Sequence, residues 1–365
     1  MLSVQFQFST CCNMKNFLPG PTEVNPEILA ELAKPVMGHH TPEFRDLISQ
    51  LKSRLQYIFG TENEVITLTC TASAALEAAL VNTCKEKILV VSNGAFGERW
   101  LQAARSRGLA SDGLVLGWGI PIPPYEVRRL LDRVPYDTVV MVHGESSTGM
   151  LNPIEPISEL LKAHPEIVFI VDAVATLGGV ELQMDKSRID VLVGASHKCL
   201  ALPPGVVPLG LSPRALKRSK SAKQKGYSFD FNLWAESWHE NKVVGTPAVP
   251  QLQAMLTQLD RIQDESIQVR WKRHKNMQEL TIHWAEKNGF IPFPPEDYRL
   301  PSVSCLRPEV SRATSPIVAA LTERGFLIDS GYGKLKGRTI RIGHMGDWTT
   351  EDIKGLLDHL SQVST

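Results

Sequence analysis

The chain has no excess of charge of either sign, because 39 Lys and Arg residues balance 39 Asp and Glu residues. A net charge near zero gives no electrostatic reason to expect nucleic acid or an anionic membrane as the main partner. No uninterrupted apolar run approaches the roughly 18 residues that a membrane-spanning helix needs. Since 43% of the 365 residues are hydrophobic, the sequence instead favours one large core and a smaller second domain.

Cysteines and targeting signals are also scarce. The six cysteines show no recurring spacing of the kind that zinc sites use, and they stand at Cys11, Cys12, Cys70, Cys84, Cys199 and Cys305. This favours a reduced, cytoplasmic protein. Residues 1–13 carry no charge, so they lack the basic start of a secretory signal and the arginines of a mitochondrial presequence. We interpret residues 1–16 as a flexible extension, with Met14 as an alternative start to Met1.

Short apolar runs alternate with helical stretches between residues 64 and 211, a pattern typical of an α/β fold. The predicted strands are 65–69, 88–91, 138–142, 167–171, 191–194 and 206–211. Their near-continuous Val, Ile and Leu content predicts a mostly parallel sheet that helices cover on both faces. Ligands of such sheets lie beyond the carboxyl ends of the strands. The residues expected at that edge are Cys70, Asn93, His143, Asp172 and Ser196.

The regions on either side of this block complete the predicted organisation. A helix is expected over Pro42–Phe59, with Thr41 as its N-cap and proline at its first position. Residues 17–250 would form a large domain with an N-terminal arm, and residues 251–365 a small α+β domain. The small domain's expected strands are 302–306, 326–328 and 339–342, and its expected flanking helices are 316–324, with Ser315 as N-cap, and 351–360.

Two ionisable residues follow neighbouring predicted strands. Lys198 comes shortly after the strand at 191–194, and Asp172 directly follows the apolar run 167–171. An ammonium and a carboxylate at buried strand ends are costly to desolvate unless they serve a function. Pyridoxal phosphate (PLP) needs both, because a lysine forms the Schiff base and an acid holds the pyridinium nitrogen protonated. Taken singly, Lys198 could be a surface lysine and Asp172 a helix N-cap.

A phosphate group needs backbone N–H groups at a helix start, and residues 69–76 supply a strand end, small hydroxyl residues and then a strong helix former. Ordinary strand–helix packing is the alternative explanation. A planar ring also needs a flat apolar face, and Phe96 lies on the expected edge. A single aromatic residue in a loop is equally compatible with core packing.

Two further features are compatible with substrate contacts. The polar stretch His143–Gly149 follows an apolar run, so its buried groups need hydrogen-bond partners, although a plain turn is an alternative. Strand alternation places Arg341 on one face with Thr339, so its guanidinium can project inward. An inward guanidinium suits a substrate carboxylate, and a structural ion pair is the alternative.

Together these motifs resemble the class V aminotransferases of PLP fold type I, above all the alanine/serine–glyoxylate aminotransferases. The most specific matching stretches are residues 143–149, 171–179 and 196–198 with 203–205, within a match from 17–22 to 341–347. The 26 residues from Asp172 to Lys198 also fit the family. The resemblance implies an α/β fold whose large domain has a mostly parallel seven-stranded sheet, followed by a smaller C-terminal α+β domain.

By this resemblance Lys198 would be the Schiff-base lysine, Asp172 the partner of the ring nitrogen, and Phe96 the residue stacked on the ring. Ser146 would lie near the ring hydroxyl, and Thr246 would reach the phosphate of a neighbouring subunit in a homodimer. The implied cofactor contacts are Thr71, Ala72, Ser73, Phe96, Ser146, Asp172, His197, Lys198 and Thr246, and the implied substrate contacts are Arg341 and Gly20.

The implied reaction moves an amino group from a small amino acid, such as alanine or serine, to a 2-oxo acid such as glyoxylate. Relatives often have glycine at the position of Ala72, tryptophan at that of Phe96 and glutamine at that of His197, so the substrate pair, including an unusual amine donor, stays open. One rival is a lyase or desulfurase of the same fold, although Cys305 sits in a predicted strand and not in a mobile loop. Another is a PLP-binding scaffold that has lost catalysis.

Overall fold

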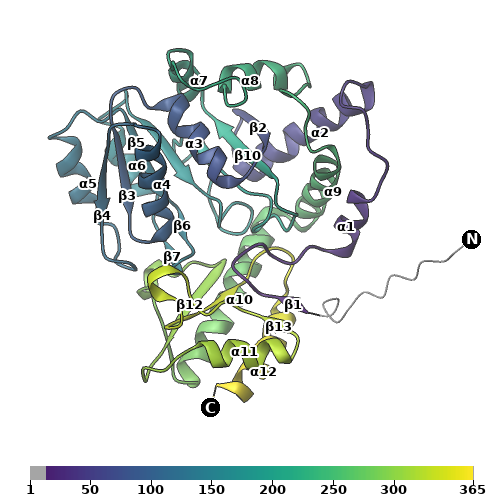
Figure 1. Ribbon diagram of the computed structural model, residues 1–365, viewed down its shortest axis with the longest axis vertical. Helices are drawn as coiled ribbons and strands as arrows, with labels where there is room; N and C mark the ends of the chain where they lie inside the picture. The colour runs from purple at the N-terminus through teal and green to yellow at the C-terminus, as the bar shows by residue number, and fades with distance from the viewer. Residues whose placement is uncertain (1–13, 365) are drawn as a thin grey trace, which may run out of the picture.

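The computed structural model describes residues 14–364 and contains a seven-stranded sheet in the order β2-β10-β9-β8-β5-β3-β4 (Figure 1). Its strands are β2 (Glu64–Thr69), β3 (Ile88–Ser92), β4 (Ser111–Val115), β5 (Thr138–Val142), β8 (Val168–Asp172), β9 (Val191–Val193) and β10 (Val206–Leu211). Strand β10 runs antiparallel to β2 and β9, and the other neighbours in this sheet are parallel. The prediction of an α/β fold with a mostly parallel sheet is confirmed.

The edge strand β4 is absent from the strands predicted above. It pairs in parallel with β3 over its whole length, but its sequence Ser-Asp-Gly-Leu-Val is half-buried to exposed. An edge strand is covered less than a central one, so it lacks the continuous apolar run by which the others were recognised.

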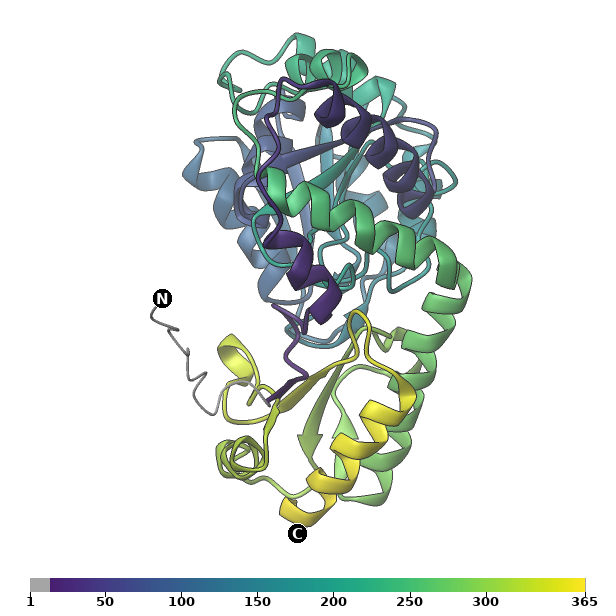
Figure 2. The ribbon, with the colours of Figure 1, turned by 90° about the vertical axis from the view of Figure 1, so that its right-hand side faces the viewer.

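Helices flank the sheet in both views (Figures 1 and 2). They are α1 (Pro26–Leu32), α2 (Pro42–Phe59), α3 (Ala72–Thr83), α4 (Ala95–Ser106), α5 (Pro124–Leu131), α6 (Glu155–Leu161), α7 (Pro213–Lys220), α8 (Phe231–His239) and α9 (Val249–Glu265). Helix α2 begins as predicted, because the Thr41 hydroxyl accepts a hydrogen bond from Phe44 N (3.3 Å). It ends at Gly60, whose φ of 59° suits a left-handed C-cap.

A second, smaller core lies below the sheet in Figure 1. It contains β11 (Phe290–Pro292), β12 (Val303–Pro308) and β14 (Ile340–Gly343), together with α10 (Ile267–Lys287), α11 (Ser315–Glu323) and α12 (Thr350–Val363). The α+β character expected of this region is found. The prediction that Ser315 is the N-cap is wrong. Helix α11 already begins at Ser315, and its N-cap is Thr314, whose side chain makes no capping hydrogen bond.

The start of the chain also differs from the prediction. Residues 1–13 of the expected flexible extension lie outside the described residues. Lys15–Asn16 belonged to that extension, but they form strand β1, which pairs in parallel with β13 (Phe326–Leu327). Phe17 then enters the smaller core and stacks on Trp348 with ring centroids 4.3 Å apart. Packing of the buried Phe17 against the half-buried Trp348 anchors the segment.

The two cores suggest where the domains meet. Buried residues of α9 pack into the larger core, whereas most of α10 packs into the smaller one. Ser266 separates these helices with a φ of 64°, caps α10 and turns the chain between them. We propose a domain boundary near Ser266, whereas the sequence prediction placed it at residue 250.

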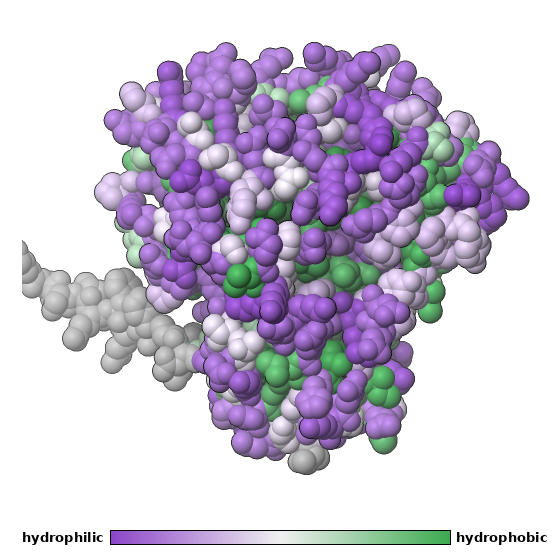
Figure 3. Space-filling view, turned by 180° about the vertical axis from the view of Figure 1, so that it is seen from behind, coloured by the Kyte–Doolittle hydropathy of each residue, from purple (hydrophilic) through white to green (hydrophobic). Residues whose placement is uncertain are grey.

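The surface is mostly polar. The face seen in Figure 3 is mostly hydrophilic, and its hydrophobic residues lie in small groups. Among residues 14–364, no helix combines the length and the hydropathy that crossing a membrane would require.

Candidate active site

The carboxyl ends of the parallel strands border a cavity of about 130 Å³. The residues that line it come from α3, α4, the last residues of β5 and β8, and the segments that follow β5, β8 and β9. The lining residues are Ala72, Ser73, Leu76, Phe96, Arg99, Val142, Gly144, Ser146, Asp172, Val174, Ala175, His197 and Lys198. The cavity therefore contains most of the predicted cofactor contacts.

Asp172 is the last residue of β8 and is 5% exposed. Its Oδ2 accepts a hydrogen bond from Trp100 Nε1 (2.8 Å), and its Oδ1 accepts one from Val174 N (2.9 Å). Burial raises the pKa of the carboxyl group, while these hydrogen bonds and the charges of Arg99 and Lys198 oppose the rise. A fixed, buried carboxylate is what a cationic ring nitrogen requires as a partner.

Lys198 is also held at the cavity. Its Nζ donates to the carbonyl oxygen of Pro19, and a side chain on Gly20, whose φ is 105°, would collide with it. Burial and then the charge of Arg341 lower the pKa of Lys198 to about 8. An amine with such a pKa is partly neutral near pH 7–8, as a nucleophile or general base must be.

Helix α3 begins where the phosphate-binding residues were predicted. Its N-cap Thr71 accepts from Ala74 N through its hydroxyl (3.2 Å), and Ala75 N donates to the Thr71 carbonyl oxygen (3.1 Å). The amides of Ala72 and Ser73 precede that first intrahelical bond and lie where an anion is favoured. Both residues line the cavity.

Phe96 lies in the first turn of α4, whose N-cap Gly94 has no side chain with which to cap it. Glu145, fully buried in β6 (Gly144–Glu145), takes that role, since its Oε2 accepts from Phe96 N and Gly97 N at 3.0 Å each. Burial raises the pKa of Glu145 to about 7, and hydrogen bonds from Ser147, Gly97 and Phe96 oppose it. The segment predicted as a polar cluster thereby positions the aromatic residue.

Arg341 lies on β14, comes from the smaller core and is 5% exposed, so its predicted inward orientation is found. Its guanidinium donates to Asp329 Oδ2 (2.7 Å) and to the Ser146 carbonyl oxygen (2.9 Å). The structural ion pair that was the alternative therefore exists as well. Arg341 Nε is buried without a partner among the described residues, so one donor of this guanidinium is unused there.

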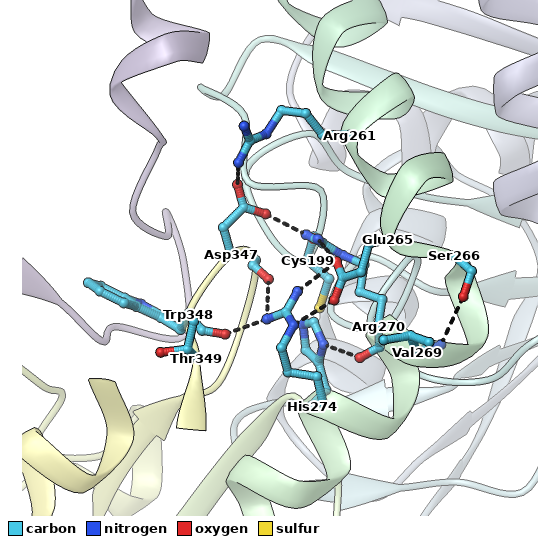
Figure 4. A network of polar contacts seen from close by, with 12 residues as sticks. Cys199, Arg261, Glu265, Ser266, Val269, Arg270, His274, Asp347, Trp348 and Thr349 are labelled. Carbon is cyan, nitrogen blue, oxygen red and sulfur yellow. Dashed lines mark hydrogen bonds and ion pairs between the residues drawn. The ribbon is translucent and has the colours of Figure 1, made fainter. Parts of the chain in front are cut away.

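A buried arginine holds the segment that follows Lys198. Arg270, 2% exposed, donates to the Cys199 carbonyl oxygen (2.8 Å) and to Asp347 Oδ1 (3.0 Å). It also pairs with Glu265 (2.9 Å), as Figure 4 shows. Asp347 follows β14, the strand of Arg341, so this network ties the lysine segment of one core to the arginine strand of the other.

Several predicted residues have other surroundings. His143 is buried, with Nδ1 3.0 Å from the Thr176 hydroxyl, and burial lowers its pKa to about 4. His197 lines the cavity, and burial and then Lys198 lower its pKa to about 4. Thr246 is exposed and does not line the cavity, so its role toward a neighbouring subunit stays a prediction. Cys305 is buried in β12, which does not resemble a mobile-loop nucleophile.

Sequence reasoning missed Trp100, Arg99 and Tyr332. It included Glu145 in the polar stretch 143–149 but did not predict that this residue caps α4. Trp100 lies one helical turn after Phe96 and therefore reaches the same edge, a relation that the spacing of four could have indicated. Tyr332 belongs to a loop before β14 and contacts Phe96 and Arg99. A contact between segments so far apart in the chain cannot be predicted from a local sequence pattern.

The family model for class-V aminotransferases matches residues 26–354. The chain therefore belongs to the class-V aminotransferases, enzymes of PLP fold type I, as its motifs predicted, and PLP is the cofactor of this family.

Among individual relatives, an uncharacterised aminotransferase of Methanocaldococcus jannaschii is 34% identical over 90% of this chain and 87% of that protein. The (S)-ureidoglycine–glyoxylate transaminase of Bacillus subtilis is 29% identical over 90% of this chain and 85% of that protein. The crystal structure of an alanine–glyoxylate aminotransferase from Nostoc sp. superposes with a TM-score of 0.91 at 28% identity, covering 96% of this chain and 95% of that one.

Proposed function

We propose that this protein is a PLP-dependent aminotransferase that moves the amino group of a small amino acid to glyoxylate or a similar 2-oxo acid. The observation that carries the proposal is one cavity lined by Asp172, Lys198 and Phe96. Relatives named as glyoxylate transaminases support the acceptor.

The residues fit the cofactor. Asp172 would hold the ring nitrogen, Phe96 would stack on the ring, and the amides of Ala72 and Ser73 would hold the phosphate. The buried Asp172 carboxylate supports this fit, because its environment otherwise disfavours a charge and a cationic ring would compensate it. When bound, PLP withdraws electrons from the substrate's Cα and so makes the α-proton acidic.

Lys198 would hold the cofactor covalently and, once an amino acid has replaced it, would move a proton at Nζ to and from the substrate's Cα. Its lowered pKa of about 8 supports this role, because the neutral amine is then available near physiological pH. The Pro19 carbonyl oxygen, to which Nζ donates, would keep the amine on this side of the cavity.

Arg341 would bind the α-carboxylate. Asp329 and the Ser146 carbonyl oxygen fix its guanidinium, so the group is ordered before the substrate arrives. We further propose a homodimer in which Thr246 contacts the partner's phosphate site, supported by its exposure and by the exposure of Thr71 and Ser73. A cytoplasmic location is supported by the free thiols of Cys70, Cys84, Cys199 and Cys305.

A panel of amino acids tests the function. The PLP-loaded protein is mixed with each amino acid and glyoxylate, and glycine and the new 2-oxo acid are measured. We expect equal amounts of both products from alanine or serine, and none from K198A. Sulfide release from cysteine without glycine formation would favour the desulfurase alternative and contradict the proposal.

A further inference from the structure

We propose that Tyr332 is a specificity-determining residue, whose ring restricts the size of the amino donor's side chain. The inference rests on the proposed function, because it takes Phe96 as the cofactor-stacking residue and Arg341 as the carboxylate anchor. Nothing in the motifs of the sequence singles out Tyr332.

The Tyr332 ring contacts both of those groups. Its centroid is 5.5 Å from that of Phe96 with an interplanar angle of 24°, and Arg341 Cζ lies 5.2 Å from the Tyr332 centroid. An amino donor bound with its nitrogen at the cofactor and its carboxylate at Arg341 has its Cα between these groups. The donor's side chain therefore begins beside the tyrosine ring.

The phenol is fixed at its other end. Arg99 Nη2 donates to the Tyr332 hydroxyl (2.8 Å), and the Arg99 guanidinium carbon lies 4.9 Å from the Phe96 centroid. Arg99 is on the same helix as Phe96, one turn later. The ring is thus held by a hydrogen bond and by contacts on its faces, which favour a fixed wall over a side chain that swings away.

The backbone around Tyr332 is fixed as well. A side chain on Gly331, whose φ is 90°, would collide with the Leu335 carbonyl oxygen, and one on Gly333 would approach Trp118 to 2.9 Å. Lys334 next to it pairs with Glu98 of α4 (2.9 Å), which also accepts from Trp118 Nε1 (2.7 Å). The loop therefore cannot retreat from α4 without breaking several contacts.

A wall of this kind favours small donors. A methyl or hydroxymethyl group adds little volume beside the ring, whereas a branched or longer side chain has to displace it. Displacing the ring separates it from Phe96 and breaks the hydrogen bond between Arg99 and the Tyr332 hydroxyl. Steric exclusion by a well-anchored ring can discriminate by about 10-fold or more.

The test compares Y332A, Y332F and the wild type. We measure kcat/KM for L-alanine and L-leucine with glyoxylate as acceptor. Y332A should raise the leucine-to-alanine ratio by about 10-fold or more. Y332F keeps the ring and should stay close to the wild-type ratio, as should Y227A, which removes an exposed tyrosine from the segment before α8. An unchanged ratio in Y332A would overturn the inference.

A binding measurement separates this inference from the proposed function. Propionate and 4-methylpentanoate have the carbon skeletons of alanine and leucine but no amine, so they bind without reacting. Isothermal titration of the PLP-loaded protein should show Y332A gaining about 10-fold in affinity for 4-methylpentanoate relative to propionate. This holds whichever oxo acid is the acceptor. If the relative affinity does not change, the role of Tyr332 is wrong even when amino transfer to glyoxylate is observed.

Discussion

The two halves of the site are built in different ways. Asp172 ends β8 and Lys198 follows the neighbouring strand β9, so one sheet brings both residues to the same edge. Arg341 comes from a three-stranded sheet with its own core, and it contacts the cavity residue Ser146 through a hydrogen bond to the Ser146 carbonyl oxygen. The cofactor half is therefore set by the fold of one domain, whereas the substrate half depends on how two cores are held together.

Two sets of contacts join the halves. Arg341 donates to the Ser146 carbonyl oxygen, and Arg270 connects Asp347 with the Cys199 carbonyl oxygen. Changes in the cofactor half should thus abolish chemistry with the fold intact. Changes in the substrate half should raise KM. Changes in the contacts that join the two halves should reduce stability.

Removing the lysine is the largest expected loss in the cofactor half. K198A should lower kcat by at least roughly 10²–10⁴-fold, because the general base is lost together with the covalent attachment. Its thermal unfolding without cofactor should be unchanged or improved, since a buried amine is removed. Single-turnover kinetics measure the loss, with K223A, an exposed lysine, as the control. Activity near the wild-type level would contradict the assignment.

Removing the charge of Asp172 should lower kcat somewhat less than removing Lys198. D172N keeps the size of the side chain but removes the negative charge that would face the ring nitrogen, so kcat should fall by about 10²–10³-fold. PLP should also dissociate more readily, which equilibrium dialysis can measure. A D172N enzyme with unchanged kcat would show that Asp172 serves only to accept from Trp100 and Val174.

The substrate half should respond mainly in KM. R341K keeps a positive charge but loses the two-pronged geometry, and a charge-assisted hydrogen bond is worth about 1.5–3 kcal/mol. We expect KM for the amino acid to rise roughly 10- to 100-fold, with a smaller change in kcat. R338K alters an exposed neighbour and is the control. A fall in kcat alone would place Arg341 in the chemistry and not in binding.

The Arg270 contacts between the two halves should affect the stability of the protein. R270Q leaves Asp347 and Glu265 without their buried partner, and breaking such a pair typically costs about 3–5 kcal/mol. Thermal unfolding should start at lower temperature than in K272Q, which changes an exposed residue of the same helix. Equal melting of the two variants would mean that the network does not hold the cores together.

The smallest expected effect is a pH dependence of the cofactor-free protein. The pKa of Lys198 is lowered to about 8 in the folded chain, from a usual value of 10.5. Between these values the unfolded chain binds more protons, so this residue makes stability rise as pH increases from about 8 to 10.5. Urea unfolding of the wild type and of K198M should diverge across that window, and parallel curves would argue against a buried amine.

The comparison also explains what the sequence could reveal. Continuous apolar runs predicted the central strands, and the residues after them, such as Asp172 and His143, followed directly from where the strands end. The half-exposed edge strand β4 has no such run and was missed. Trp100 could be recovered from helical spacing, but Tyr332 and Glu145 act through contacts between segments far apart in the chain. Those contacts depend on tertiary packing, which no local pattern encodes.

The most direct test of the account is to trap the cofactor on the protein. Borohydride reduction of the PLP-loaded wild type, followed by proteolysis and mass spectrometry, should place the pyridoxyl label on the peptide that contains Lys198. K198A treated in the same way should carry no label. A label on another lysine, or none in the wild type, would contradict the central claim that the sheet edge between Asp172 and Lys198 is the catalytic centre.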